Sequence, residues 1–231
     1  MLFIPFVLAC TQVSPTIKRD NQQIISYSMI TGSMPAHGVT ADHSPVILPP
    51  SILDGEDPGL ALFRQPATRE KVVSFYTERT GSVVISVSIL DNADKYDIPL
   101  PLAFSLSWVE SSFLSWAVNE NKDSVDRGLF QLNSRSFPDL TEEDFFDPYV
   151  NADNGLQYLK KCIELGGNEV VGLAMYNAGR TRVEKGGTPR TTLTYIARIL
   201  DYREQLEKEF SRQLLMEGIV LRDASPINPT S

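Results

Sequence analysis

The segment between Ile98 and Asn119 constrains the fold most strongly, because Glu110 is the only charged residue in it. A helix begins after Ile98, with prolines tolerated in its first turn, and we expect it to run to about Phe113. At helical spacing its large apolar side chains occupy all sides of the helix, so it must be buried. The rest of the chain therefore has to supply elements that surround this helix.

Five other segments have apolar residues at the three- and four-residue spacing of helices. They predict helices over residues 69–80, 82–96, 147–165, 169–178 and 191–215. The segment 82–96 is ambiguous: its β-branched residues favour a strand, whereas Ile85, Ile89, Ala93 and Tyr96 lie on one helical face. We adopt the helix, and the expected fold class is all-α.

Composition narrows the possible partners and cofactors. The 231-residue chain has 21 Lys and Arg against 29 Asp and Glu, a net charge of −8, so it lacks the basic field that nucleic acids require. It has no run of about eighteen apolar residues, so no membrane-spanning helix is predicted. His37 and His43 have no supporting carboxylate or cysteine cluster, so we expect no metal site and no cofactor.

The first ten residues predict a targeting signal. Residues 2–9 form a short apolar run, and Val7-Leu8-Ala9-Cys10 is followed directly by polar residues. This pattern resembles the lipobox of bacterial lipoproteins, which implies that residues 1–10 form a lipoprotein-like signal peptide and that Cys10 carries acyl chains. The protein would then be anchored on the periplasmic side of a bacterial membrane. The alternative is a secreted or soluble periplasmic protein.

The proline distribution predicts the domain organisation. Residues 11–66 contain seven of the fifteen prolines and show no apolar periodicity, which is typical of a tether. We therefore expect the folded domain to cover residues 67–215 and a tail to cover residues 216–231. With Cys10 acylated, Cys162 has no disulfide partner and should be a buried apolar residue on a helix.

Glu110 is the candidate for acid–base chemistry. Burial among apolar side chains and a place near the C-terminus of a helix both raise the pKa of a carboxyl group. A carboxylic acid that keeps its proton near neutral pH suits general-acid catalysis at a glycosidic oxygen. A glutamate that merely reaches solvent or a core hydrogen bond is the alternative at this point.

Four sequence blocks favour a catalytic over a structural role for Glu110. In order along the chain they are residues 110–113 (ESSF), 119–133 (NENKDSVDRGLFQLN), 146–148 (FDP) and 174–179 (AMYNAG). Together they resemble the soluble lytic transglycosylase (SLT) domain of the lysozyme-like superfamily, over about residues 83–207. The resemblance implies a helical lysozyme-like fold. It also implies cleavage of the β-1,4 bond between N-acetylmuramic acid and N-acetylglucosamine in peptidoglycan, with Glu110 as the catalytic acid.

The resemblance also implies a set of substrate-binding residues. Gln131 matches a glutamine that points into the glycan cleft, while Phe130 replaces the usual methionine beside it. Tyr176 matches a tyrosine near the catalytic acid. The remaining candidates are Ser111, Ser124, Asn133, Asn177 and Tyr195. As alternatives, Tyr176 and Tyr195 also fit the pattern of core residues, and Gln131 or Asn133 could cap a helix. Amides, hydroxyls and aromatic rings suit a neutral sugar chain.

Only one carboxyl group stands out, although ordinary glycosidases use two. In the family, the glutamate protonates the leaving oxygen and then deprotonates the muramyl C6 hydroxyl, which closes a 1,6-anhydro ring. Two alternatives remain open. Asp123 or Asp126 could activate water, as in a hydrolytic goose-type-like lysozyme, or the protein could be a catalytically dead peptidoglycan-binding scaffold.

Overall fold

The apolar segment around Glu110 forms α4 (Leu100–Ser111), whose residues from Leu100 to Ser107 are all buried. The computed structural model describes residues 57–216, which belong to one compact unit of the chain. The predicted burial of this helix is confirmed for its first two turns. It is wrong for its end, because Trp108 is 37% exposed and Trp116, beyond the helix, is 68% exposed.

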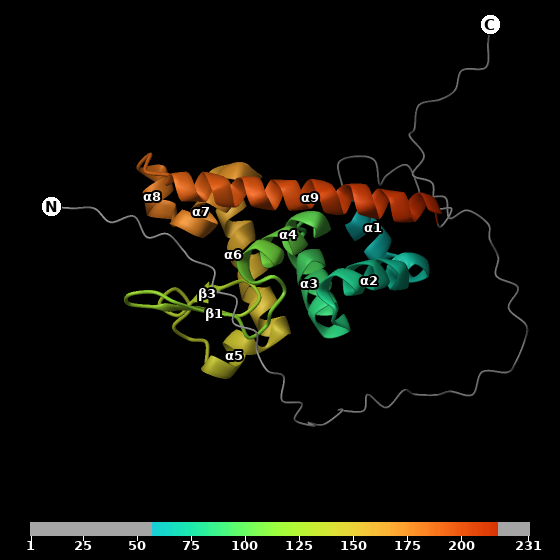
Figure 1. Ribbon diagram of the computed structural model, residues 1–231, viewed down its shortest axis with the longest axis horizontal. Coiled ribbons are helices and arrows are strands. Elements are labelled where there is room, and N and C mark those ends of the chain that lie inside the picture. Colours follow the sequence, from blue (N-terminus) through green and yellow to red (C-terminus); the bar gives the residue numbers. More distant parts are fainter. Residues whose placement is uncertain (1–56, 217–231) are drawn as a thin grey trace, which may run out of the picture. The chain divides into compact units, whose positions relative to one another are not determined.

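Three helices precede α4. They are α1 (Pro58–Arg64), α2 (Pro66–Thr80) and α3 (Val83–Tyr96), and α2 packs on both of the others. Figure 1 shows them together, in cyan to green, beside α4. The helix α1 lies inside the segment predicted to be a tether, and its buried Leu60, Leu62 and Phe63 show that the folded domain begins before residue 67.

The ambiguous segment 82–96 is a helix, as predicted. Gly81 ends α2 with a φ of +70°, and the hydroxyl of Ser82 then accepts a hydrogen bond from the backbone N–H of Ile85. This N-cap offsets the weak helix propensity of the β-branched residues that follow. Ile89 and Ala93 are fully buried, so burial of one face decides the conformation.

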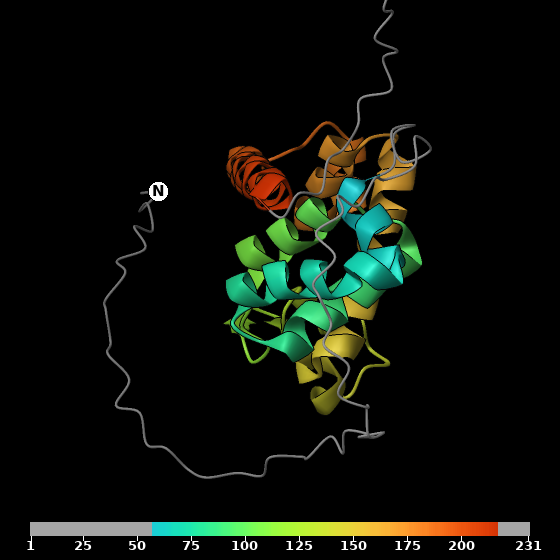
Figure 2. The ribbon, with the colours of Figure 1, turned by 90° about the vertical axis from the view of Figure 1, so that its right-hand side faces the viewer.

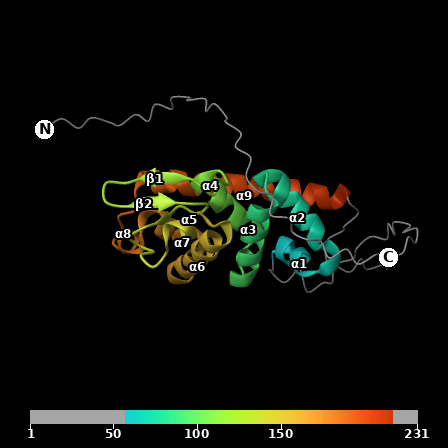
Figure 3. The same cartoon turned by 90° about the horizontal axis from the view of Figure 1, so that it is seen from below.

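A small antiparallel sheet follows α4 and was not predicted. Its strands are β1 (Val118–Glu120), β2 (Val125–Arg127) and β3 (Leu132–Asn133), in the order β1-β2-β3. Figure 3 shows β1 and β2 side by side. The fold is nevertheless mostly helical, so the expected fold class is confirmed apart from this sheet.

The second half of the domain contains α5 (Glu142–Phe146), α6 (Pro148–Gly166), α7 (Glu169–Ala178), α8 (Arg180–Glu184) and α9 (Arg190–Met216). The helix α6 packs against α3 and α7, and α9 packs against α4 and α7. Figure 1 shows α9 as one long helix, orange to red, that runs past α4, and Figure 2 shows the same helix nearly end-on. This arrangement brings the ends of α4 and α7, the sheet and the first half of α9 to one region.

Several sequence predictions concern residues beyond those described. Cys10, His37, His43 and most of the predicted tether and tail lie outside residues 57–216. Cys162 lies inside them and is buried with a free thiol, as predicted. Within the described residues, no helix combines the length and apolar character needed to cross a membrane.

Candidate active site

Glu110 lies in the last turn of α4, and the chain turns sharply just after it. Ser112 and Phe113 have φ values of +54° and +63°, and the N–H of Ser112 caps the helix by donating to the carbonyl of Trp108 at 2.8 Å. Two such left-handed residues in succession cost energy outside glycine. The turn leads the chain directly from Glu110 into the small sheet.

Burial raises the pKa of Glu110 from 4.5 to about 7. The hydroxyl of Tyr195, on α9, donates to Glu110 Oε1 at 2.5 Å, which lowers this pKa, and the charge of Asp126 raises it. Burial is the largest of these effects, in agreement with the sequence analysis. A carboxyl group with this pKa can both give and take a proton near neutral pH.

Two tyrosines from different helices are electrostatically coupled to Glu110. Burial, followed by the charge of Glu110, raises the pKa of both Tyr176 and Tyr195 well above the usual value, so both hydroxyls keep their protons. The hydroxyl of Tyr176, near the end of α7, donates to the carbonyl of Phe130 at 2.9 Å. Tyr195 therefore contacts the acid, and Tyr176 lies near it but anchors the neighbouring turn.

The turn from Gly128 to Gln131 lies against the end of α4, where Ser111, the residue after the acid, donates to the carbonyl of Leu129. Gly128 has a φ of +79°, and a Cβ there would lie 2.2 Å from the carbonyl oxygen of Phe145. Gln131 also has a positive φ, and its Nε2 donates to the carbonyls of Ala117 and Gly128 at 3.2 and 3.0 Å. Its amide N–H groups thus fix the turn, which leaves Oε1 as the atom available to a ligand.

Asn151, a buried residue on α6, supports this turn, and the sequence analysis missed it. Its Oδ1 accepts from the N–H of Phe130 at 2.8 Å, and its Nδ2 donates to the carbonyls of Arg127 and Phe145 at 3.1 and 2.8 Å. One side chain thus ties α5, α6 and the turn together. Nothing in the local sequence separates it from an ordinary helix asparagine.

Ser111 and Asn177 also support the site. The buried hydroxyl of Ser111 donates to the carbonyl of Leu129 at 2.8 Å, which ties α4 to the turn. Asn177 Oδ1 accepts from the hydroxyl of Thr192 at 2.7 Å, which links α7 to α9. These contacts position Glu110, Tyr176 and Tyr195 relative to one another, and the burial of Ser111 keeps it from a glycan.

A polar row crosses the sheet beside the site. Asp126 on β2 is paired in register with Asn119 on β1 and Asn133 on β3. Its Oδ2 accepts from the amides of Asn119 and Asn121, at 3.2 and 2.8 Å, and its Oδ1 accepts from Asn133 at 2.7 Å. Asn133 also donates to the hydroxyl of Ser124 at 2.8 Å. The candidate residues Ser124 and Asn133 therefore share one network with Asp126.

Exposed tryptophans lie on both sides of the acid in the sequence, Trp108 before it and Trp116 after it. Trp108 stacks on Tyr202 of α9, with ring centroids 5.2 Å apart. Trp116 is exposed, and its neighbour Ala117 accepts the hydrogen bond from Gln131. The sequence analysis expected all sides of this helix to be buried, because apolar periodicity does not distinguish a helix that is buried along its whole length from one whose last turn is exposed.

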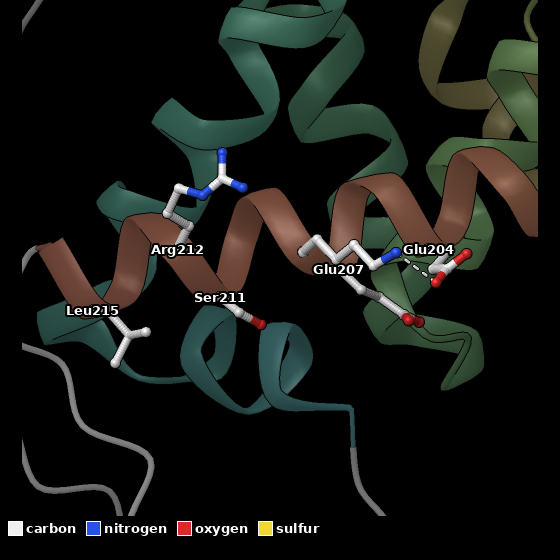
Figure 4. A pocket seen from close by; sticks show the side chains of 6 residues that line it. Glu204, Glu207, Ser211, Arg212 and Leu215 are labelled. Atoms are coloured by element: carbon white, nitrogen blue, oxygen red, sulfur yellow. Dashed lines mark hydrogen bonds and ion pairs between the residues drawn. The ribbon is translucent and has the colours of Figure 1, made fainter.

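A second hollow on α9 is separate from this site. Figure 4 shows it on the C-terminal half of the helix, where it begins nine residues after Tyr195. At about 1.5 Å per residue this corresponds to about 14 Å along the helix. Its lining residues are Glu204, Glu207, Lys208, Ser211, Arg212 and Leu215.

The described residues contain no group of three or more His, Cys, Asp and Glu side chains close enough to hold a metal ion. The side chains of the site itself are one carboxyl group with a pKa of about 7, tyrosine hydroxyls and amides. Such a set can transfer protons to and from an uncharged ligand.

Comparison with known families gives one match. Residues 88–195 match the model of the transglycosylase SLT domain. No solved structure matches the chain. The matched span begins in α3 and ends at Tyr195, so it includes Glu110 and all the candidate residues of the site. SLT domains act on peptidoglycan in the cell-wall space. Residues 88–195 of the chain are therefore a transglycosylase SLT domain of the lysozyme-like superfamily.

Proposed function

We propose that this SLT domain is a lytic transglycosylase. It cleaves the β-1,4 bond between N-acetylmuramic acid and N-acetylglucosamine and leaves a 1,6-anhydro end on the muramic acid. The observation that carries the proposal is the pKa of about 7 that burial gives Glu110. One such group can act as acid in the first step and as base in the second.

In the first step, protonated Glu110 donates its proton to the glycosidic oxygen while the bond from this oxygen to C1 of the muramic acid breaks. The departing sugar leaves with a new hydroxyl group, and positive charge develops at C1. Glu110 is now a carboxylate, which the hydroxyl of Tyr195 stabilises through its hydrogen bond. The field of this carboxylate also favours the positive charge on the sugar.

In the second step, the Glu110 carboxylate removes the proton from the C6 hydroxyl of the same sugar. The C6 oxygen bonds to C1 and closes the anhydro ring, and Glu110 ends protonated and ready for another cycle. No water is consumed. The attacking hydroxyl is tethered to the reacting sugar, which gives it a high effective concentration, so a second carboxylate is not needed.

The polar groups around Glu110 suit the neutral substrate. Gln131 Oε1 accepts a hydrogen bond from an acetamido N–H or a hydroxyl group, since its own amide N–H groups are used in the turn. Ser124 and Asn133 are candidates for further hydroxyl contacts from the sheet. Tyr176 and Asn177 hold the turn and α9 in place around the acid.

The competing reaction is hydrolysis with Asp126 as the base for water. One observation favours it, since the charge of Asp126 reaches Glu110 and raises its pKa. Three amide N–H donors already occupy the Asp126 carboxylate oxygens. A base that must accept a proton from water would have to give up part of this network. Asp123 is exposed beside the sheet and forms no hydrogen bond or ion pair with residues 57–216 that would direct it to the site.

Mass spectrometry of the products tests this proposal. Purified protein is incubated with peptidoglycan, and the released fragments are compared with those of Glu110→Gln. We expect fragments with anhydro ends from the native protein and none from the variant. Fragments with ordinary reducing ends would support the hydrolase. Binding to peptidoglycan without release of fragments by the native protein would support a dead scaffold.

We also propose that Cys10 is acylated and holds the enzyme on the membrane surface that faces the cell wall. The support is the short apolar run that ends at this cysteine. Replacing Cys10 with Ala should move the protein from the membrane fraction to the soluble fraction of cells. A variant that stays in the membrane fraction would contradict the acylation.

A further inference from the structure

A groove between α3, the β3–α5 loop and α6, which we call the α6 groove, lies apart from the residues proposed for the reaction. Among the described residues that line it, none is catalytic and none is a candidate for binding the glycan. Its cavity volume is about 620 Å³, which is typical of a ligand site. The lining residues that characterise it are Tyr96, Phe137, Gln157, Tyr158, Lys160 and Lys161.

A contact between two aromatic rings lies between the α6 groove and the catalytic site. Tyr158 lines the groove, and its ring packs on that of Tyr176, with centroids 5.2 Å apart. The hydroxyl of Tyr176 donates to the carbonyl of Phe130, in the turn that lies against the end of α4. The groove and the catalytic site are thus two sets of residues, and a ligand can occupy the groove without contacting Glu110.

Three half-buried aromatic side chains give the α6 groove its apolar walls. Tyr96 comes from α3, Phe137 from the β3–α5 loop and Tyr158 from α6. The ring of Phe137 packs edge-on against that of Tyr158, with centroids 6.0 Å apart, and the hydroxyl of Tyr96 donates to Asp153 at 2.6 Å. Because these contacts hold the rings in place, the ordering cost of binding a ligand is small. Aromatic side chains of this kind are enriched where proteins bind one another.

The polar side chains of the α6 groove are free to bind a ligand. Those of Gln157, Lys160 and Lys161 form no hydrogen bond or ion pair within residues 57–216. Glu164 also lines the groove, so its two lysines and one glutamate carry a net charge of +1, although the whole chain has a net charge of −8. Two adjacent unpaired cations favour a ligand with carboxylates. The free amide of Gln157 has donors and an acceptor, which match the two groups of a peptide bond.

Aromatic walls, a free amide and two lysines together suit a polypeptide segment that carries both acidic and apolar side chains. We propose that the α6 groove is the docking site for such a segment of a partner protein. The lysines pair with its carboxylates, Gln157 bonds to its backbone, and the rings pack on its apolar side chains. A flat lipid surface does not fit a concave groove, and the negative charge of the chain disfavours nucleic acid. Docking there does not depend on the reaction at Glu110.

Selection from a phage library of random dodecapeptides on the native protein tests the docking site. We expect the selected peptides to be enriched in Asp and Glu next to Leu, Ile and Phe. They are then synthesised and titrated against the native protein and the double variant Lys160→Ala, Lys161→Ala. Their Kd should rise about tenfold in the variant, the scale of one charged contact. Selected peptides without this enrichment, or equal binding to both proteins, would overturn the proposal.

A matched control removes the same charge elsewhere. Lys208→Ala with Arg212→Ala takes two cations from the hollow on α9 (Figure 4) and should bind the selected peptides as the native protein does. An equal rise in Kd in this control would show a general charge effect and would also overturn the proposal.

Reversing the charge of the groove gives a gain of binding that loss of fold cannot imitate. The variant Lys160→Glu, Lys161→Glu should bind the same peptides more tightly once Lys replaces their Asp and Glu residues, whereas the native protein should bind these altered peptides more weakly. If the reversed variant and the native protein rank the two sets of peptides alike, the lysines do not contact the carboxylates.

Competition with peptidoglycan distinguishes a partner protein from the substrate. The titrations are repeated with soluble peptidoglycan fragments at a concentration that saturates the native protein. The Kd of the selected peptides should not change, because the groove and the catalytic site are separate sets of residues. The variant Lys160→Ala, Lys161→Ala should also bind the fragments with the native affinity. Displacement of the peptides by the fragments, or weaker binding of the fragments by the variant, would assign the groove to the substrate and overturn the proposal.

Discussion

Replacing Glu110 with Gln should stabilise the fold at neutral and alkaline pH. Burial raises the pKa of Glu110 from 4.5 to about 7 in the folded protein, whereas the unfolded chain exposes this group to water. Between these two values the folded state holds a proton that the unfolded state has released, so the free energy of unfolding falls as pH rises. At about 1.4 kcal/mol per pKa unit, ionised Glu110 destabilises the fold by about 3 kcal/mol.

Glutamine has nearly the shape of the protonated acid and no charge, so it removes this pH-dependent loss. Denaturant unfolding of the native protein and of Glu110→Gln at pH 5 and pH 8 measures this loss of stability. The free energy of unfolding of Glu110→Gln minus that of the native protein should be about 2.5 kcal/mol larger at pH 8 than at pH 5. The increase is smaller than the full loss because part of the loss has already occurred at pH 5. Glu120→Gln removes an exposed carboxyl group from β1 and serves as the control. Its free energy of unfolding should differ from that of the native protein by the same amount at both pH values. If Glu110→Gln differs from the native protein by the same free energy of unfolding at both pH values, burial does not raise the pKa of Glu110.

Three further substitutions test the surroundings of Glu110. Tyr195→Phe removes a hydrogen bond that lowers the pKa of Glu110, so the alkaline limb of the kcat/KM profile should move to higher pH; an unmoved limb would contradict the contact. Asp126→Asn removes a charge that raises this pKa, so the same limb should move to lower pH while anhydro products persist. Loss of all cleavage with an intact fold would instead favour Asp126 as a base. Gly128→Ala should cost at least about 3 kcal/mol, because its Cβ would lie 2.2 Å from the Phe145 carbonyl oxygen; a native-like thermal melt would exclude this strain.

Helical periodicity predicted the long helices because each buries one face. The segment 82–96 illustrates this, since burial of Ile89 and Ala93 outweighs the strand propensity of its β-branched residues. The helix α1 was not predicted because it has only seven residues and lies in a proline-rich segment. The sheet was not predicted because its strands have two or three residues each and all residues of β1 are exposed. Such short strands show no alternation of apolar and polar residues.

The acid could be located from the sequence because its isolation among apolar residues is a local property. The residues that hold it could not be found in this way. Asn151 supports the turn from a helix that begins 20 residues after Gly128, and Thr192 reaches Asn177 from another helix. Such contacts depend on how helices pack.

The reaction in water labelled with heavy oxygen tests the central claim most directly. If Glu110 acts alone and the C6 hydroxyl closes on C1, the new muramic acid ends carry the anhydro mass and no label. If water attacks C1, every new end gains one labelled oxygen. Unlabelled anhydro ends are the predicted result, and labelled reducing ends would contradict the account.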